Sequence, residues 1–191
     1  MPTSNYPSAY KQFKAITDLY KHSENKLLFG RFVYRYRLAR SFDGIIADGI
    51  GRTLTGYNAI LKVFLAYTAY EQLLKGASGL HVYQLGSIKT NRVVDLELAS
   101  RLRMNKKLID SLINYSTDSK LVGELVAFRK EASDDITCVA YAIRNIFAHG
   151  DLTATSTGLA LKAQRTTLLD LADFLLDYCN DNFTKCVDKL R

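Results

Sequence analysis

With 191 residues, the chain is long enough for one domain with a sizeable hydrophobic core, and we expect no second module. Hydrophobic residues make up 48% of the sequence and charged residues 24%, a composition that excludes a disordered or fibrous protein. Lysine and arginine outnumber aspartate and glutamate by 26 to 19, and the net charge of +7 favours polyanionic partners such as nucleic acid, or is simply an excess of solvated cations.

The sequence permits long helices, because both prolines, Pro2 and Pro7, lie at its start. We expect helices over residues 6–21 and 25–40, followed by a loop over 42–56. The second helix interleaves basic and aromatic side chains, which are Arg31, Phe32, Tyr34, Arg35, Tyr36, Arg37 and Arg40. This pattern suits RNA through charge and base stacking, or a helix that buries its aromatics and solvates its arginines. We favour the second interpretation.

The helix expected over residues 57–75 is apolar almost all round, which is typical of the middle of a bundle. Gly76 and Gly79 predict that it ends near Lys75. Glu71 shares the core-facing side of this helix, and a buried carboxylate needs a basic partner. Arg144 is the best candidate for that partner.

Further helices are expected over residues 92–103, 106–115, 119–130, 134–148 and 167–191, with a polar loop over 150–158. Ser133, Asp134 and Asp135 are candidate caps or first-turn acids for the fourth of these. No strand pattern is present, and residues 82–85 favour a loop. The sequence therefore predicts an all-α protein with one helical domain over 1–191, comprising a core over 57–189 and an N-terminal helical extension over 6–41.

The cysteines Cys138, Cys179 and Cys186 show no metal-ligand spacing and are interpreted as core thiols in a reducing compartment. The start of the chain lacks the apolar stretch of a secretory signal. The longest uncharged hydrophobic run, residues 63–70, is far shorter than the roughly 20 residues that span a bilayer. We therefore expect a cytoplasmic protein without a membrane partner.

Residues 142–150, with the sequence AIRNIFAHG, combine a cation, an amide and an imidazole where a helix meets a glycine. The Arg144 guanidinium matches phosphate oxygens, and His149 exchanges a proton near neutral pH. RNA supplies its own nucleophile, the 2′-hydroxyl, so a base and a charge suffice to cleave it without a metal. Asn145 can hold the imidazole or a phosphate oxygen. The expected products carry a 2′,3′-cyclic phosphate and a 5′-hydroxyl.

On an unbroken helix, Arg144 and His149 would point about 140° apart. Their convergence on one phosphate requires the helix to end near Ala148, which the following Gly150 favours, or requires a second copy of the chain to complete the site.

This R-N-x-x-x-H pattern before a glycine, with an earlier helix reading Y-E-Q-L-L-K at 70–75, resembles the HEPN (higher eukaryotes and prokaryotes nucleotide-binding) family. The resemblance implies an up-and-down bundle of four to five core helices, a homodimer and a metal-independent ribonuclease without a cofactor. Arg144, Asn145 and His149 match the R-x(4–6)-H motif, and Glu71 takes the place of an acidic residue from an earlier helix.

By the same resemblance, the protein acts on RNA or a nucleotide as a toxin or antiviral effector, with an antitoxin or other regulatory partner. The toxins that pair with nucleotidyltransferase antitoxins carry a tyrosine two residues after the histidine, where this chain has Asp151. Regulation by modification of such a tyrosine is therefore not implied.

Two other interpretations stay open. The groove at these motif residues also suits a non-catalytic module that binds nucleotide, RNA or a protein. The chain also fits a purely structural dimerisation domain. In these cases, His149 is a C-terminal helix residue favoured by the dipole and Arg144 joins two helices by a salt bridge. His22 and His81 are interpreted as surface residues, and the basic cluster at 101–107 as a solvated face.

Overall fold

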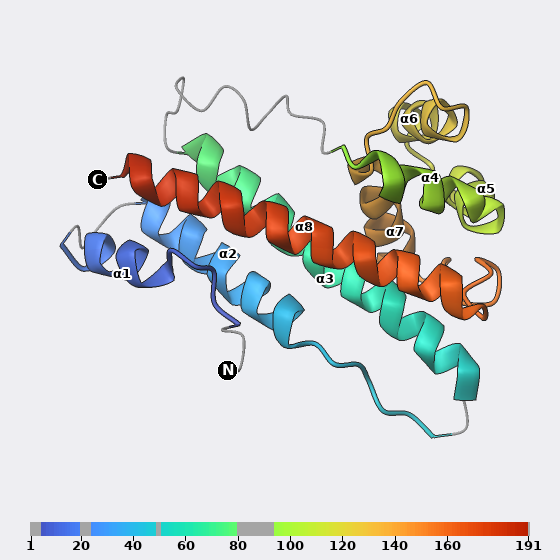
Figure 1. Cartoon of the computed structure of the whole chain (residues 1–191), viewed down its shortest axis with the longest axis horizontal. Coiled ribbons are helices and arrows are strands. Elements are labelled where there is room, and N and C mark those ends of the chain that lie inside the picture. The colour runs from blue at the N-terminus through green and yellow to red at the C-terminus, as the bar shows by residue number, and fades with distance from the viewer. Residues whose placement is uncertain (1–4, 20–23, 49–50, 80–93, 191) are drawn as a thin grey trace. The chain divides into compact units, whose positions relative to one another are not determined.

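The described part of the chain is built from helices. The computed structural model describes residues 5–19, 24–48, 51–79 and 94–190, and within these ranges it contains eight α-helices and one isolated β-bridge, between Val94 and Asp135 (Figure 1). The predicted all-α fold is confirmed. The helices are α1 (Tyr10–Leu19), α2 (Glu24–Ser41), α3 (Gly51–Gly79), α4 (Leu96–Met104), α5 (Lys106–Tyr115), α6 (Ser119–Arg129), α7 (Thr137–Ala148) and α8 (Lys162–Lys189). None of those within the described ranges has the length and apolar character to cross a membrane.

The chain divides into two compact units, each assembled from separate stretches of sequence. Unit 1 comprises residues 1–42, 65–91 and 173–191, and unit 2 comprises residues 43–64 and 92–172. Helices α3 and α8 each contribute residues to both units. The single domain expected over 1–191, with its core over 57–189, is not tested by this division and stays a prediction.

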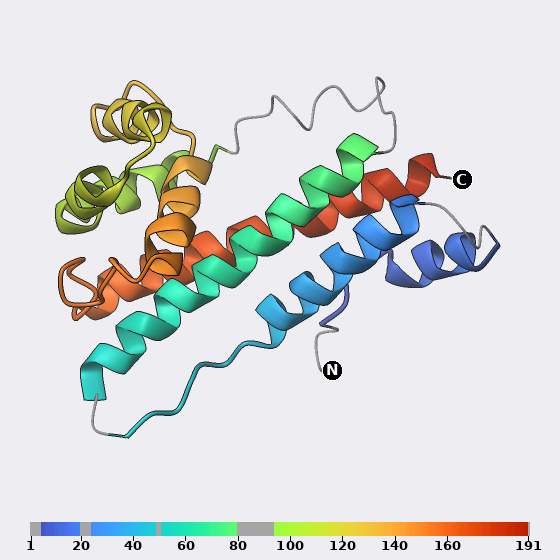
Figure 2. The same ribbon diagram turned by 180° about the vertical axis from the view of Figure 1, so that it is seen from behind.

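Unit 1 is held together by a cluster of phenylalanine rings around Phe183 of α8. Its ring centroid lies 5.4 Å from that of Phe13 of α1, and 5.7 Å and 5.0 Å from those of Phe29 and Phe32 of α2. Phe29, Phe32 and Phe183 are completely buried. Helix α2 therefore lies beside the C-terminal part of α8 within this unit (Figure 2). The edge-to-face pairs of Phe183 with Phe13 and Phe29 add to the stabilisation that comes from burying the rings.

Gly76, which the sequence analysis took as the end of a helix, is instead a point of close packing. The predicted end of the helix near Lys75 is wrong, because α3 continues through Gly76 to Gly79. A Cβ atom at Gly76 would lie 3.0 Å from the Phe29 ring, so the absence of a side chain lets α2 approach α3 in unit 1.

The predicted loop over 42–56 is also too long, since α3 begins at Gly51. In unit 2, a Cβ atom at Gly56 would lie 2.6 Å from the Cβ of Ala154, so the missing side chain accommodates the 150–158 loop. That loop is non-helical as predicted, and it buries Leu152, Ala154 and Thr157.

The remaining boundaries follow local hydrogen bonding. Helix α1 begins at Tyr10, later than the predicted residue 6, and the Tyr10 N–H donates to the carbonyl of Pro7. Helix α7 begins at Thr137, later than the predicted residue 134, because the Asp135 carboxylate accepts bonds from the N–H and hydroxyl of Thr137 and so holds a turn ahead of the helix. Helix α8 begins at Lys162, ahead of the predicted residue 167. The predicted helices over 25–40, 106–115 and 119–130 are confirmed to within one residue. Residues 82–85 lie outside the described residues.

In unit 2, Arg103 at the end of α4 binds and stabilises the connection between α6 and α7. Its Nε donates to the carbonyl of Phe128 and its Nη2 to that of Ser133, both at 2.8 Å, and it forms an ion pair with Asp134. The guanidinium also lies over the Phe128 ring. Only 14% of this side chain is exposed, so its partners would lose their bonds in a largely dry environment if it were removed.

All the cysteines are free and buried, as the sequence analysis predicted. Burial is the main reason why the pKa of the Cys138 thiol is raised to about 12 and that of Cys186 to about 11. Both thiols therefore stay protonated at neutral pH and behave as small apolar core groups.

Arg103→Ala is expected to lower the free energy of unfolding by about 2–3 kcal/mol, because it strands two backbone carbonyls and the Asp134 carboxylate. Arg129→Ala is the matched control, since Arg129 is 47% exposed and pairs with the Asp110 carboxylate alone among the described residues. That control should cost less than about 1 kcal/mol. Urea denaturation followed by circular dichroism measures both, and equal losses would contradict the role of Arg103.

Phe183→Ala is expected to lower the free energy of unfolding by about 3–5 kcal/mol, because it leaves a cavity among three other rings. Tyr34→Ala removes an aromatic ring that is 72% exposed and should change stability by about 0.5 kcal/mol or less. Thermal and urea unfolding compare the two variants. A Phe183 variant as stable as the Tyr34 variant would show that the ring cluster does not hold unit 1 together.

Candidate functional site

Helix α7 carries the predicted motif, and its end determines where each motif residue lies. The helix buries the side chains of Val139, Ala140, Ile143 and Ile146 completely or nearly so. Arg144 and Asn145 are half-buried, and His149 is exposed just beyond the last helical residue, Ala148. The predicted end of the helix at about Ala148 is therefore confirmed.

The helix ends in a hydrogen-bond pattern that depends on glycine. Gly150 has a φ of +84°, in the left-handed region that other residues rarely adopt. Its N–H donates to the carbonyl of Phe147, and the Asp151 N–H donates to that of Ile146. These two bonds form a Schellman motif, which satisfies the last carbonyls of α7 and turns the chain away after His149.

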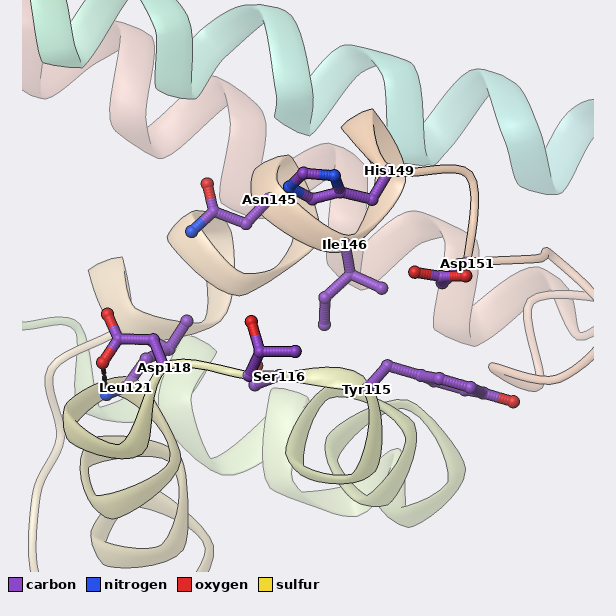
Figure 3. Close-up of a pocket in the computed structure, with 9 residues that line it drawn as sticks. Tyr115, Ser116, Asp118, Leu121, Asn145, Ile146, His149 and Asp151 are labelled. Carbon is purple, nitrogen blue, oxygen red and sulfur yellow. Dashed lines mark hydrogen bonds between the residues drawn. The ribbon is translucent and has the colours of Figure 1, made fainter.

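A pocket of about 490 Å³ opens between the end of α7 and the connection from α5 to α6, both within unit 2 (Figure 3). Asn145, Ile146 and His149 come to it from α7 and its cap (Figure 3). The remaining lining residues are Tyr115, Ser116, Thr117, Asp118, Leu121 and Asp151.

Two of the three predicted motif residues line this pocket, and the third is bonded to one of them. Asn145 and His149 are four residues apart, which places them about 40° apart on the helical wheel and therefore on one face. Arg144 is not among the lining residues. Its Nη1 donates to Oδ1 of Asn145 at 2.7 Å, which leaves the Asn145 amide nitrogen as the donor for a ligand.

The sequence analysis missed the opposite wall of the pocket, where Asp118 lies. Its Oδ1 caps α6 by accepting bonds from the N–H groups of Lys120 and Leu121, at 2.9 Å and 3.3 Å. Ser116 lies on the same connection, and its buried Oγ has no hydrogen-bond partner in the described part of the chain. The Thr117-Asp118 dipeptide ahead of α6 is a recognisable capping signal, but nothing in the sequence connects it with residue 149.

The pocket is therefore polar and of mixed character. Asn145 and His149 can donate to an anion, whereas the carboxylates of Asp118 and Asp151 accept hydrogen bonds and repel a second negative charge. The arrangement suits a ligand that carries one negative group beside hydrogen-bond donors.

Glu71 belongs to unit 1, whereas Arg144 belongs to unit 2. The Glu71 side chain is 27% exposed, and its Oε1 lies 3.4 Å from Nζ of Lys75, one turn along α3. Lys75 is thus a basic partner for this half-buried carboxylate. The expected pairing of Glu71 with Arg144 stays a prediction.

The described residues contain no group of three or more histidine, cysteine, aspartate or glutamate side chains that could hold a metal ion. The predicted surface histidines, His22 and His81, lie outside the described residues. Comparisons of the chain with protein-family models, curated proteins and solved structures find no match, so its resemblance to the HEPN family stays a prediction.

Proposed function

We propose that the protein is a metal-independent endoribonuclease of the HEPN type. The observation that carries this proposal is the placement of His149, an exposed imidazole at the mouth of a pocket that it shares with Asn145. The bond from Arg144 to Asn145 keeps a guanidinium beside the same amide. One helix end thus supplies a base, a hydrogen-bond donor for a phosphate oxygen, and a cation.

In the proposed reaction, His149 accepts the proton of a ribose 2′-hydroxyl, and the oxygen attacks the neighbouring phosphorus. The Asn145 amide nitrogen donates to a non-bridging phosphate oxygen, while Arg144 stabilises the negative charge of the phosphorane from behind that amide. The bond from phosphorus to the 5′-oxygen then breaks, and the protonated imidazole returns a proton to the leaving oxygen. The products are a 2′,3′-cyclic phosphate and a 5′-hydroxyl.

The Asp118 carboxylate orients the substrate in this proposal. Because it lies on the α5–α6 connection and repels phosphate, the scissile group lies on the side of α7. The sugar hydroxyls or the amino groups of a base then face Asp118, which accepts hydrogen bonds from them. One phosphate at a time occupies the pocket, as expected for cleavage within a flexible strand.

The wider setting of the proposal comes from the resemblance alone. It describes a cytoplasmic homodimer that acts as a toxin or antiviral effector and is restrained by an antitoxin or another regulatory partner. A second copy of the chain would bring a second Arg144 and His149 to the assembly.

The chain should cleave mixed RNA in the presence of a metal chelator, and His149→Ala should slow cleavage by about 10²–10⁴-fold because it removes the general base. His81→Ala, at a histidine that the sequence analysis interprets as a surface residue, is the matched control and should retain activity. Gel analysis measures the rate, and end-labelling identifies the cyclic phosphate and the 5′-hydroxyl. RNA binding without cleavage would replace the nuclease by a non-catalytic binding module, and the absence of both would leave a structural domain.

Glu71→Gln is expected to reduce cleavage about tenfold or more if the carboxylate holds Arg144 in place, since a charge-assisted hydrogen bond contributes about 1.5–3 kcal/mol. Lys75→Gln is the matched control, because it removes the partner of Glu71 within α3 and leaves the carboxylate. Cleavage rates and melting temperatures are measured for both variants. If the Glu71 variant is fully active, or if both variants lose activity equally, Glu71 does not act through Arg144.

A further inference from the structure

The solvent-facing side of α2 carries a row of side chains that the core does not use. Successive turns of the helix bring together Leu27, Arg31, Tyr34, Arg35 and Leu38, which we call the α2 stripe. All five are exposed, with Tyr34 at 72%, Leu27 at 59% and Leu38 at 57%.

The structure separates the aromatic side chains of α2 by face. Phe32 and Tyr36 are buried, as the sequence analysis favoured, with Phe32 in the ring cluster of unit 1. Tyr34 is the exception and lies on the opposite face. An exposed tyrosine between two exposed arginines has no part in the packing of the unit, because the core of α2 is complete without it.

The arginines of α2 are also divided by face. Arg40 pairs with Asp173 and Asp177 of α8, and Arg37 stacks over the Tyr6 ring at 3.9 Å. Arg31 and Arg35 are exposed, and neither has an ion-pair or hydrogen-bond partner within the residues that the structure describes. The sequence from 25 to 42 contains no aspartate or glutamate, so the one acid of α2 is Glu24, the first residue of the helix.

We propose that the α2 stripe binds single-stranded RNA. Tyr34 stacks on an unpaired base, and Arg31 and Arg35 contact the phosphates on either side of it. The two arginines are separated by one helical turn, about 6 Å along the axis, which is close to the separation of successive phosphates in an extended strand. Leu27 and Leu38 extend the row with apolar contacts for neighbouring sugars and bases. The choice of RNA rests on the proposed function.

Other occupants fit the α2 stripe less well. A second copy of the chain packed by two-fold symmetry would place this cationic row against itself, and α2 has no acid after its first residue, Glu24, to neutralise it. A membrane surface needs a continuous apolar face, whereas the apolar face of α2 is turned into unit 1 and the stripe offers separated leucines. Duplex RNA offers phosphates but no unstacked base for Tyr34.

The test is fluorescence anisotropy of the full chain with a labelled 12-residue oligouridine that carries 2′-O-methyl groups. This probe lacks the 2′-hydroxyl nucleophile, so its binding is measured without cleavage. Tyr34→Ala should weaken binding about 5- to 150-fold, the loss of one stacked base, whereas Tyr34→Phe keeps the ring and should stay within about twofold. Circular dichroism and the melting temperature establish that both variants fold.

The charge contribution is tested by replacing Arg31 and Arg35 together with glutamine. This double variant should reduce the slope of log affinity against log salt concentration by about 1.4, because each phosphate contact to a single strand contributes about 0.7. Replacing Lys106 and Lys130 with glutamine is the matched control, since both are exposed and the change in net charge is the same. The control should leave the slope within about 0.3 of the unmodified chain.

Equal effects of the two double variants, or an unchanged affinity for Tyr34→Ala, would overturn the proposal. It would also be overturned by equal binding of a 2′-O-methyl duplex, by stronger binding to anionic phospholipid vesicles than to the oligonucleotide, or by dimerisation that Tyr34→Ala abolishes. If the chain binds the probe but cleaves no RNA, the nuclease proposal is wrong and the proposal for the α2 stripe holds. If the chain cleaves RNA equally well without Tyr34 and both arginines, the nuclease proposal holds and the proposal for the α2 stripe is wrong.

Discussion

The candidate site depends on the way α7 ends. If the chain continued as a helix beyond Ala148, Asp151 would follow the helical path and the pocket would lose the turn that forms one side of it. Gly150 prevents this by taking a positive φ, and the two Schellman bonds then hold the reversal. His149 is left at the helix cap with an exposed ring, while Asn145 stays in the last turn on the same face.

The polar groups of the pocket are fixed by neighbours that have their own structural tasks. Asp118 caps α6 and faces the pocket with the same carboxylate, so its position follows from the start of that helix. Asn145 is held by Arg144, and Ile146 anchors the last turn of α7 in the core. Donors on α7 and acceptors on the α5–α6 connection therefore face one another across a preformed space, an arrangement that suits a ligand with both kinds of polar group.

Local signals in the sequence were sufficient for the fold class and for the boundaries of α2, α5 and α6. The predictions for α2, α5 and α6 hold because the signals for these helices are local in the chain. Each helix has periodic apolar residues, and Asn105 and Asp118 cap α5 and α6 directly ahead of them. The predictions were wrong at Gly56 and Gly76, because these glycines pack closely against Ala154 and Phe29, residues that are far away in sequence. Residues 115–118, which form one wall of the pocket, are also far in sequence from α7, so the sequence did not indicate that they lie beside it. For the motif, Gly150 correctly predicted the helix end, whereas the placement of Asn145 rather than Arg144 on one face with His149 follows from the four-residue interval between them.

The order in which the units are completed follows from how they share the chain. During synthesis, unit 2 has all its residues once position 172 has left the ribosome. Helices α1 and α2 are made earlier but must wait for residues 173–191, because Phe183 supplies the ring around which their own phenylalanines pack. In a nascent chain, α1 and α2 therefore expose an apolar surface until Phe183 has been made, and a chain truncated after residue 172 would retain the pocket's residues while leaving that surface uncovered.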